Sequence, residues 1–147
     1  MAKQPLIIVM GIAGCGKSHA CKRLDPSRFY YVSYDGNRNK YHLDMLRACP
    51  KDKVAVYDLN IKTSTFIKRH SDEFDIRVVG IGKDKITSRA NLLSRGGKFT
   101  RYFYSRWKVM QRRFKSYAEF VALDGDEAAQ YINSLDISSM VRKGGGA

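Results

Sequence analysis

The sequence predicts an α/β fold in which a parallel five-stranded sheet is flanked by helices. Short apolar runs of strand length alternate along the chain with longer stretches of helical pattern, and Gly, Pro and Asp residues separate them. Strands that alternate with helices form parallel sheets that are covered on both faces. The chain has 147 residues, of which 44% are hydrophobic, and this is enough apolar material for one core.

The predicted strands are short apolar runs bounded by breakers. They span Leu6–Met10, Phe29–Ser33, Val54–Tyr57, Ile76–Ile81 and Phe120–Leu123. The predicted helices lie between these strands and end near Pro or Gly residues. They span about Lys17–Leu24, Asn37–Ala48, Ser64–Ser71, Lys83–Ser94, Thr100–Phe114 and Asp126–Leu135.

We expect a single domain over residues 1–140, with a basic helical lid at about 83–115. The segment 141–147 is expected to be a flexible tail, because it ends in a low-complexity, glycine-rich stretch. No internal repeat is present in the sequence.

The net charge of the chain is +13, from 27 Lys and Arg against 14 Asp and Glu. Such an excess predicts attraction to polyanions, and nucleic acid, with DNA favoured, is the expected partner. Bulk charge alone leaves an acidic membrane surface open, but no long apolar span is present, and we predict no membrane partner.

The three cysteines are an odd number without paired or zinc-type spacing, and no signal peptide precedes them. We therefore expect a reducing, cytoplasmic location, in the host cell if the protein is viral. Cys15 lies inside the glycine-rich segment described next, where a small tolerated side chain is a better interpretation than a reactive thiol.

The segment Gly11-Ile12-Ala13-Gly14-Cys15-Gly16-Lys17-Ser18 fits the pattern G-x-x-x-x-G-K-[ST], follows an apolar strand and opens a helix. Glycines let the backbone curl around phosphates with its N–H groups pointing inward. This context predicts a P-loop NTPase fold, and a glycine turn with an incidental lysine would leave the strand and helix unexplained. The predicted nucleotide-binding residues are Gly11, Ala13, Gly14, Cys15, Gly16, Lys17, Ser18 and His19.

The predicted ligand of this loop is ATP or GTP with Mg²⁺. Lys17 is expected to reach the β and γ phosphates, and the Ser18 hydroxyl to ligate the metal. The third predicted strand leads into Asp58, which is expected to help hold Mg²⁺, directly or through water. The alternative for Asp58 is a structural Asx turn at the end of the strand.

The second predicted strand delivers Asp35 and Arg38 to the carboxyl edge of the sheet, where open parallel sheets bind ligands. Asp35 could accept the proton of an attacking hydroxyl, and Arg38, one turn along the next helix, could hold an anionic substrate group. The alternative is that Asp35 caps a helix beginning near Asn37 and Arg38 is solvated.

The segment 83–115 carries eleven Lys or Arg residues against one acid, Asp84. Its apolar stripe, Phe103, Trp107, Met110 and Phe114, is interpreted as core rather than as a base-stacking surface. The opposite face carries Arg101, Lys108, Arg112 and Lys115, which suit contact with a phosphate backbone, although a merely solvated basic face is the alternative.

Arg95 precedes Gly96-Gly97, a predicted flexible hinge at the end of the first lid helix, and bending there could close the lid over the donor nucleotide. It is the arginine expected to neutralise charge on the transferred phosphoryl group. The predicted nucleic-acid contacts are Arg38, Arg89, Arg101, Arg106, Lys108 and Arg112, and the predicted catalytic residues are Asp35, Lys17, Arg95 and Arg38.

Over about residues 5–112 the chain resembles the P-loop kinases typified by bacteriophage polynucleotide 5′-hydroxyl kinase, which are related to zeta-type toxins and small nucleotide kinases. The residues that carry this resemblance are the loop at 11–18, Asp35-Gly36-Asn37-Arg38, Asp58-Leu59-Asn60 and Ser94-Arg95-Gly96 within a basic segment, followed by Ser105-Arg106-Trp107-Lys108-Val109-Met110. The resemblance implies Asp35 as general base, Arg38 as a substrate-phosphate contact and Arg95 as the lid arginine. Leu59 departs from the Thr usual in that family.

Only 22 residues separate Asp35 from Asp58, fewer than we expect for this family. We hypothesise a shallower acceptor site, which would admit a hydroxyl on a base, such as hydroxymethylpyrimidine in DNA, instead of a threaded 5′ end. The predicted function is therefore ATP-dependent phosphoryl transfer to a hydroxyl of nucleic acid. The alternatives are a guanylate-kinase-like nucleoside-monophosphate kinase and a nucleotide-gated nucleic-acid-binding module without turnover.

Overall fold

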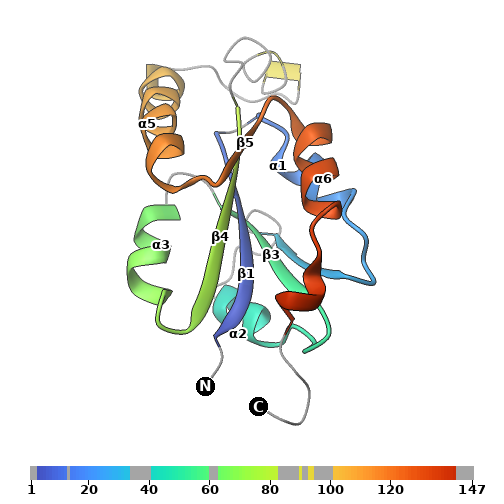
Figure 1. The fold of residues 1–147 in the computed structure, drawn as a ribbon. Coiled ribbons are helices and arrows are strands. Elements are labelled where there is room, and N and C mark those ends of the chain that lie inside the picture. The colour runs from blue at the N-terminus through green and yellow to red at the C-terminus, as the bar shows by residue number, and fades with distance from the viewer. Residues whose placement is uncertain are drawn as a thin grey trace.

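The computed structural model describes residues 3–12, 14–33, 41–59, 63–82, 90, 93–94 and 101–141, with 101–104 and 106 described by their backbone alone. Within these residues the chain forms a five-stranded sheet with helices on both faces (Figure 1). The α/β fold predicted from the sequence is confirmed.

All of the strand pairs in the sheet are parallel, and the strand order is β2-β3-β1-β4-β5. Every residue of the central strand β1 is buried. The strand bounds are β1 Gln4–Met10, β2 Phe29–Ser33, β3 Val54–Leu59, β4 Phe74–Ile81 and β5 Phe120–Ala122.

Most of the described helices begin and end within about three residues of the predicted positions, and the start of α2 is the exception. Their bounds are α1 Lys17–Lys22, α2 His42–Arg47, α3 Thr63–His70, α5 Arg101–Tyr117 and α6 Gly125–Asn133, with a short 3-10 helix at Ile137–Ser139. Helices α1 and α6 cover one face of the sheet, whereas α3 and α5 lie on the other (Figure 1). The predicted helix over 83–94 lies mostly outside the described residues. In this segment the structure describes Ala90, Leu93 and Ser94, and all three are helical.

Two boundaries differ from the prediction in ways that matter for the site. Helix α2 begins at His42, because Tyr41 has a non-helical backbone, so the predicted start at Asn37 is wrong. Strand β3 continues through Asp58 to Leu59, because both of its neighbours pair with that part of it: Ser33 of β2 opposes Asp58, and Met10 of β1 opposes Leu59.

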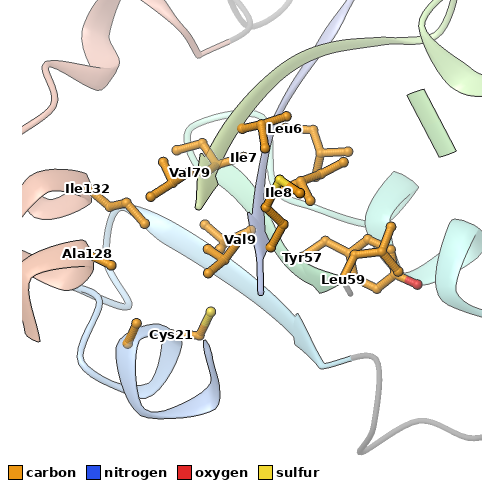
Figure 2. Close-up of a cluster of buried hydrophobic side chains, with 14 of the residues drawn as sticks. Leu6, Ile7, Ile8, Val9, Cys21, Tyr57, Leu59, Val79, Ala128 and Ile132 are labelled. Atoms are coloured by element: carbon orange, nitrogen blue, oxygen red, sulfur yellow. The ribbon is translucent and has the colours of Figure 1, made fainter. Parts of the chain in front are cut away.

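The core is formed by both faces of β1. Val9 lies on the side of Cys21, Ala128 and Ile132, whereas Tyr57 and Leu59 lie on the other side (Figure 2). Alternation of side chains along each strand produces this division.

The apolar stripe of α5 packs into the core as predicted. Met110 and Phe114 are buried and Trp107 is half-buried, while the side chain of Phe103 lies outside the described residues. Gly80 of β4 makes room for this helix, because a Cβ atom there would lie 2.7 Å from Cδ1 of Phe114. In the part of the chain that the structure describes, no helix is both long and apolar enough to cross a membrane.

Candidate nucleotide-binding site

The candidate site lies at the carboxyl edge of the sheet. The register of the parallel strands brings the ends of β3 and β4 beside the end of β1, with Met10 opposite both Leu59 and Gly80. The glycine loop that follows β1 and the carboxylate of Asp58 therefore lie at the same edge, which is where open parallel sheets bind ligands.

The glycine loop turns sharply between β1 and α1. Gly14 and Gly16 have positive φ angles of 83° and 105°, in the left-handed region that residues with a Cβ atom rarely adopt. Gly16 is the N-cap of α1 and accepts the backbone N–H of Ala20. The loop thus favours glycine at both positions; the sequence pattern specifies the glycine at Gly16, whereas Gly14 is one of its variable positions. Ala13 lies outside the described residues.

Cys15 fills the space beneath this loop. Its side chain is buried, and a Cβ atom added to Gly11 would lie 2.3 Å from the Cys15 sulfur and 2.7 Å from the carbonyl oxygen of Ile81. A Cβ atom added to Gly82, whose φ is 126°, would lie 3.5 Å from Cβ of Cys15. Cys15 therefore packs between the loop and the end of β4, which supports the interpretation of a small structural side chain. All three cysteines of the chain are buried free thiols.

Lys17 folds back over the loop that precedes it. Its Nζ atom donates hydrogen bonds to the carbonyl oxygens of Gly11 at 2.7 Å and Ile12 at 3.2 Å. The ammonium group is thus held among backbone atoms of the loop, where the phosphates of a nucleotide would compete with the two carbonyls for its protons.

Ser18 and Asp58 come together at the first turn of α1. The Ser18 hydroxyl oxygen lies 3.5 Å from Oδ2 of Asp58, and the hydroxyl of Tyr31 donates to the same oxygen at 2.5 Å. Asp58 is only 2% exposed, and a buried carboxylate needs hydrogen-bond donors such as these. Tyr31 is a site residue that the sequence analysis missed, because it is brought to Asp58 by the pairing of β2 with β3 rather than by a motif.

The environment of Asp58 shifts the pKa values of its neighbours. Burial is the main cause that raises the pKa of Tyr31 far above its ordinary value, and the hydrogen bond to Asp58 is the second. The Tyr31 hydroxyl therefore stays protonated and able to donate. The pKa of the Cys21 thiol is also raised well above its usual range, mainly by burial and secondly by the negative charge of Asp58. Cys21 is therefore a protonated apolar side chain and not a nucleophile.

The donor set around Ser18 fits Mg²⁺ better than a transition metal. Among the described residues no group of three or more His, Cys, Asp or Glu side chains could hold a metal ion. Mg²⁺ in phosphate-binding sites takes one or two protein oxygens and completes its shell with phosphate oxygens and waters. The Ser18 hydroxyl and the Asp58 carboxylate provide oxygens of this kind side by side.

The amino end of α6 abuts the glycine loop, which the sequence analysis did not anticipate. A Cβ atom on Gly125 would lie 2.7 Å from the carbonyl oxygen of Gly16. The next residue, Asp126, forms a hydrogen bond of 2.7 Å through its Oδ1 atom with Nε2 of His19. The hydrogen bond from His19 lowers the pKa of the exposed Asp126 carboxyl, and the positive charge of the nearby Arg23 lowers it further by a smaller amount. The sequence does contain a helix-start signal here, the pattern Asp124-x-x-Glu127, which could have located the amino end of α6. In the structure the Asp124 carboxylate accepts a hydrogen bond of 2.8 Å from the backbone N–H of Glu127.

The acceptor and lid residues predicted from the sequence lie outside the described residues. They are Asp35, Arg38, Arg89 and Arg95, while the side chains of Arg101 and Arg106 on α5 are also not described. Helix α2 has Tyr41 as its N-cap and makes no side-chain cap hydrogen bond, and the residues 34–40 before it are outside the described part of the chain. Both interpretations of Asp35 and Arg38, the catalytic one and the capping one, therefore remain predictions.

The polar face of α5 is basic and exposed where it is described. Lys108, Arg112 and Lys115 are exposed, and Arg113, which the pattern placed between the two faces, is half-buried. Among the described side chains of α5, three cations are therefore exposed to solvent.

No protein-family model and no curated protein matches the chain. Among solved structures, the chain is similar to shikimate kinase from Acinetobacter baumannii in complex with shikimate, with a TM-score of 0.57 and 11% sequence identity. The match covers 95% of this chain and 96% of that one. Together with the sheet order and the glycine loop, it shows that the chain has the α/β fold of a small P-loop kinase.

Proposed function

We propose that the chain is a phosphotransferase that moves the γ-phosphoryl group of ATP or GTP to a hydroxyl. One observation carries the proposal: the Lys17 ammonium lies on the glycine loop, while the Ser18 hydroxyl next to it lies 3.5 Å from a buried carboxylate, that of Asp58. A glycine turn with an incidental lysine does not need a buried acid beside the following hydroxyl, because burying a carboxylate is costly.

Each residue of the site has a proposed task. Lys17 neutralises charge on the β and γ phosphates, and Ser18 and Asp58 hold Mg²⁺, which supplies further positive charge to the phosphates when it is bound. The acceptor oxygen bonds to the γ phosphorus as the bond to the β-phosphate oxygen breaks, and the hydroxyl proton passes to the carboxylate of Asp35. Arg38 and Arg95 act on the acceptor and on the transferred group.

Nucleic acid, and DNA in particular, is the acceptor that we propose. The support is electrostatic: the chain carries a charge of +13, and the exposed face of α5 carries Lys108, Arg112 and Lys115. Phosphate backbones attract such surfaces without regard to sequence. This acceptor would fit the family resemblance to polynucleotide 5′-hydroxyl kinases, and the short interval between Asp35 and Asp58 adds a base-borne hydroxymethyl group to the candidates.

A small-molecule hydroxyl is the second candidate acceptor. It is favoured by the similarity to shikimate kinase, which extends over nearly the whole of both chains and whose matched structure holds shikimate. A nucleoside monophosphate is the small acceptor that the sequence itself suggests. A nucleic-acid-binding module that is gated by nucleotide but has no turnover is the remaining alternative.

A transfer assay with γ-labelled ATP and GTP separates these candidates. The acceptors are 5′-hydroxyl oligonucleotides of DNA and RNA, matched DNA with and without hydroxymethylpyrimidine, nucleoside monophosphates and shikimate. We expect label on DNA, with Asp35→Asn abolishing transfer while nucleotide binding persists. Label on a small molecule alone would establish the second candidate, and label on 5′ ends alone would exclude the base-borne hydroxyl.

The same assay decides whether the chain is an enzyme. A wild-type protein that binds ATP and nucleic acid but labels none of these acceptors would be the binding module, and the proposal of phosphoryl transfer would be wrong.

A further inference from the structure

The hydroxyl of Tyr31 donates a short hydrogen bond of 2.5 Å to the carboxylate of Asp58, beside Ser18. A role for this contact follows from where the two residues lie in the sheet. Ser33 of β2 is directly opposite Asp58 of β3, and Tyr31 precedes Ser33 by two residues, so all three side chains are on the same face. Tyr31 therefore reaches Asp58 diagonally, as a long side chain can between paired strands.

The hydroxyls of Tyr31 and Ser18 approach the same oxygen of Asp58. Oδ2 is 2.5 Å from the Tyr31 hydroxyl and 3.5 Å from the Ser18 hydroxyl. The Tyr31 bond is much the closer of the two, and it comes from a rigid ring on a paired strand, whereas Ser18 lies in the first turn of a six-residue helix. Of these two groups, Tyr31 therefore restrains the orientation of the carboxylate more strongly.

We infer that Tyr31 is a positioning residue for Mg²⁺: it holds the Asp58 carboxylate beside the Ser18 hydroxyl, so that the two protein oxygens are in place before the metal and nucleotide bind. The inference rests on the proposed function, since it assigns Ser18 and Asp58 to the metal of a bound nucleotide. Residues that orient the ligands of a metal commonly affect its affinity almost as strongly as the ligands do.

Tyr30 provides a matched control. It is the preceding residue of the same strand, it is also half-buried, and by alternation it lies on the opposite face of the sheet. Tyr30→Phe and Tyr31→Phe each remove one hydroxyl oxygen from β2, but only the second removes the bond to Asp58.

The experiment measures binding of ATP and of GTP by calorimetry at rising Mg²⁺ concentrations and in EDTA. The proteins are the wild type, Tyr31→Phe, Tyr30→Phe, Asp58→Asn and the double variant Tyr31→Phe with Asp58→Asn. We expect Tyr31→Phe to raise the half-saturating Mg²⁺ concentration about tenfold and Tyr30→Phe to leave it near the wild-type value. Nucleotide affinity in EDTA should be the same in all five proteins, because the change acts on the metal and not on the loop.

The double variant tests whether Tyr31 acts through Asp58. If it does, adding Tyr31→Phe to Asp58→Asn raises the Mg²⁺ requirement much less than tenfold, because the carboxylate to be oriented is already gone. A full tenfold effect in that background would overturn the inference.

The remaining outcomes distinguish the two proposals. A wild type whose nucleotide binding depends on Mg²⁺, with a Tyr31→Phe variant that behaves like Tyr30→Phe, overturns the role of Tyr31 and leaves the proposed function standing. Equal loss of affinity in EDTA and in Mg²⁺ shows that Tyr31 only supports the fold, which also overturns the role. A wild type that binds neither nucleotide at any Mg²⁺ concentration overturns both.

Discussion

Gly125, the first residue of α6, packs against the carbonyl oxygen of Gly16 at the end of the glycine loop. A Cβ atom at Gly125 would lie 2.7 Å from that oxygen and 3.0 Å from Cδ2 of His19. The contact joins two segments that are distant in the sequence, and it fixes the side of the loop that faces α6. The loop is thus supported from β4 through Cys15 and from α6 through Gly125.

Gly125→Ala is expected to destabilise the protein by about 1–3 kcal/mol, the usual cost of forcing an atom into a packed site. Alanine is otherwise the better helix former, by about 1 kcal/mol in a helix interior, so helix propensity acts in the opposite direction. The clash should prevail because the obstructing atom belongs to the backbone. Urea unfolding measures the stability and calorimetry the ATP affinity, which should fall as the loop shifts.

Gln130→Ala is the control for this variant, because Gln130 is an exposed residue of the same helix. It should leave both quantities close to those of the wild type. A Gly125→Ala protein as stable as the wild type, with unchanged nucleotide affinity, would show that the loop gives way without cost.

Gly11→Ala tests the packing beneath the loop. The added Cβ atom would meet the Cys15 sulfur at 2.3 Å and the Ile81 carbonyl oxygen at 2.7 Å, and only the sulfur is able to move. We expect loss of nucleotide binding together with destabilisation of about 1–3 kcal/mol. Adding Cys15→Ala should not restore binding, since the Ile81 carbonyl remains; full restoration would show that the sulfur alone excludes a side chain at position 11.

Lys17→Met is expected to remove phosphoryl transfer while the protein stays folded. The substitution keeps a long side chain but loses the charge that faces the phosphates, and loss of one such electrostatic group costs about 100-fold or more in rate. Stability should change by no more than about 1 kcal/mol, because the side chain is half-buried and its partners are loop carbonyls. Transfer assays and thermal unfolding are the measurements, and undiminished transfer would remove Lys17 from the site.

The pair of Arg47 and Glu73 predicts a small pH dependence of stability away from the site. Arg47 donates two hydrogen bonds to the Glu73 carboxylate, at 2.7 and 2.8 Å, and chiefly these bonds hold the pKa of Glu73 below its ordinary value. Because the pKa of Glu73 is lower in the folded protein than in the unfolded chain, the ion pair stabilises the fold at pH values above the unfolded-state pKa of about 4.3. This stabilisation is lost as the pH falls through the lower pKa of the folded protein.

Glu73→Gln should therefore cost about 0.5 kcal/mol at pH 7, the scale of an exposed ion pair, and much less near pH 3. Asp72→Asn, which removes the same charge from the preceding exposed residue, is the control. Urea unfolding across this pH range measures the difference, and a cost that stays constant with pH would mean that the ion pair is not its source.

The sequence predicted those parts of the fold that local patterns specify. The apolar runs located all five strands, and the spacing of Met110 and Phe114 on one helical face correctly identified the side of α5 that enters the core. The start of α2 was predicted too early because the sequence before His42 offers several residues that favour a helix start, such as Asp35 and Asn37. The observed N-cap, Tyr41, makes no side-chain cap hydrogen bond and gives no such signal.

The candidate site was predictable only where a motif is continuous. Lys17 and Ser18 follow from the glycine pattern, and Asp58 from its place at the end of an apolar strand. Tyr31 and Gly125 depend on which strands and helices become neighbours, and the strand order β2-β3-β1-β4-β5 is a property of the tertiary fold. Sequence spacing does not encode such contacts directly, so these residues emerge only from the structure.

The basic face of α5 yields a prediction about the acceptor. Lys108, Arg112 and Lys115 are exposed, and replacing all three with Ala removes three positive charges from one surface. The matched control is the triple replacement of Lys3, Lys22 and Lys51 with Ala, which removes the same charge at exposed positions outside α5 and the neighbouring α3. Equal effects of the two variants would mean that only net charge matters.

We expect the α5 variant alone to lose affinity for DNA, with ATP binding unchanged in both. The slope of log affinity against log salt should become shallower by about 0.7–0.9 for each phosphate contact removed, because each contact releases condensed counterions. Fluorescence anisotropy of labelled single- and double-stranded DNA from low to moderate salt gives these slopes. If the α5 variant retains the wild-type slope and transfers phosphate to DNA as before, the acceptor is bound elsewhere, and the basic face is only a solvated surface.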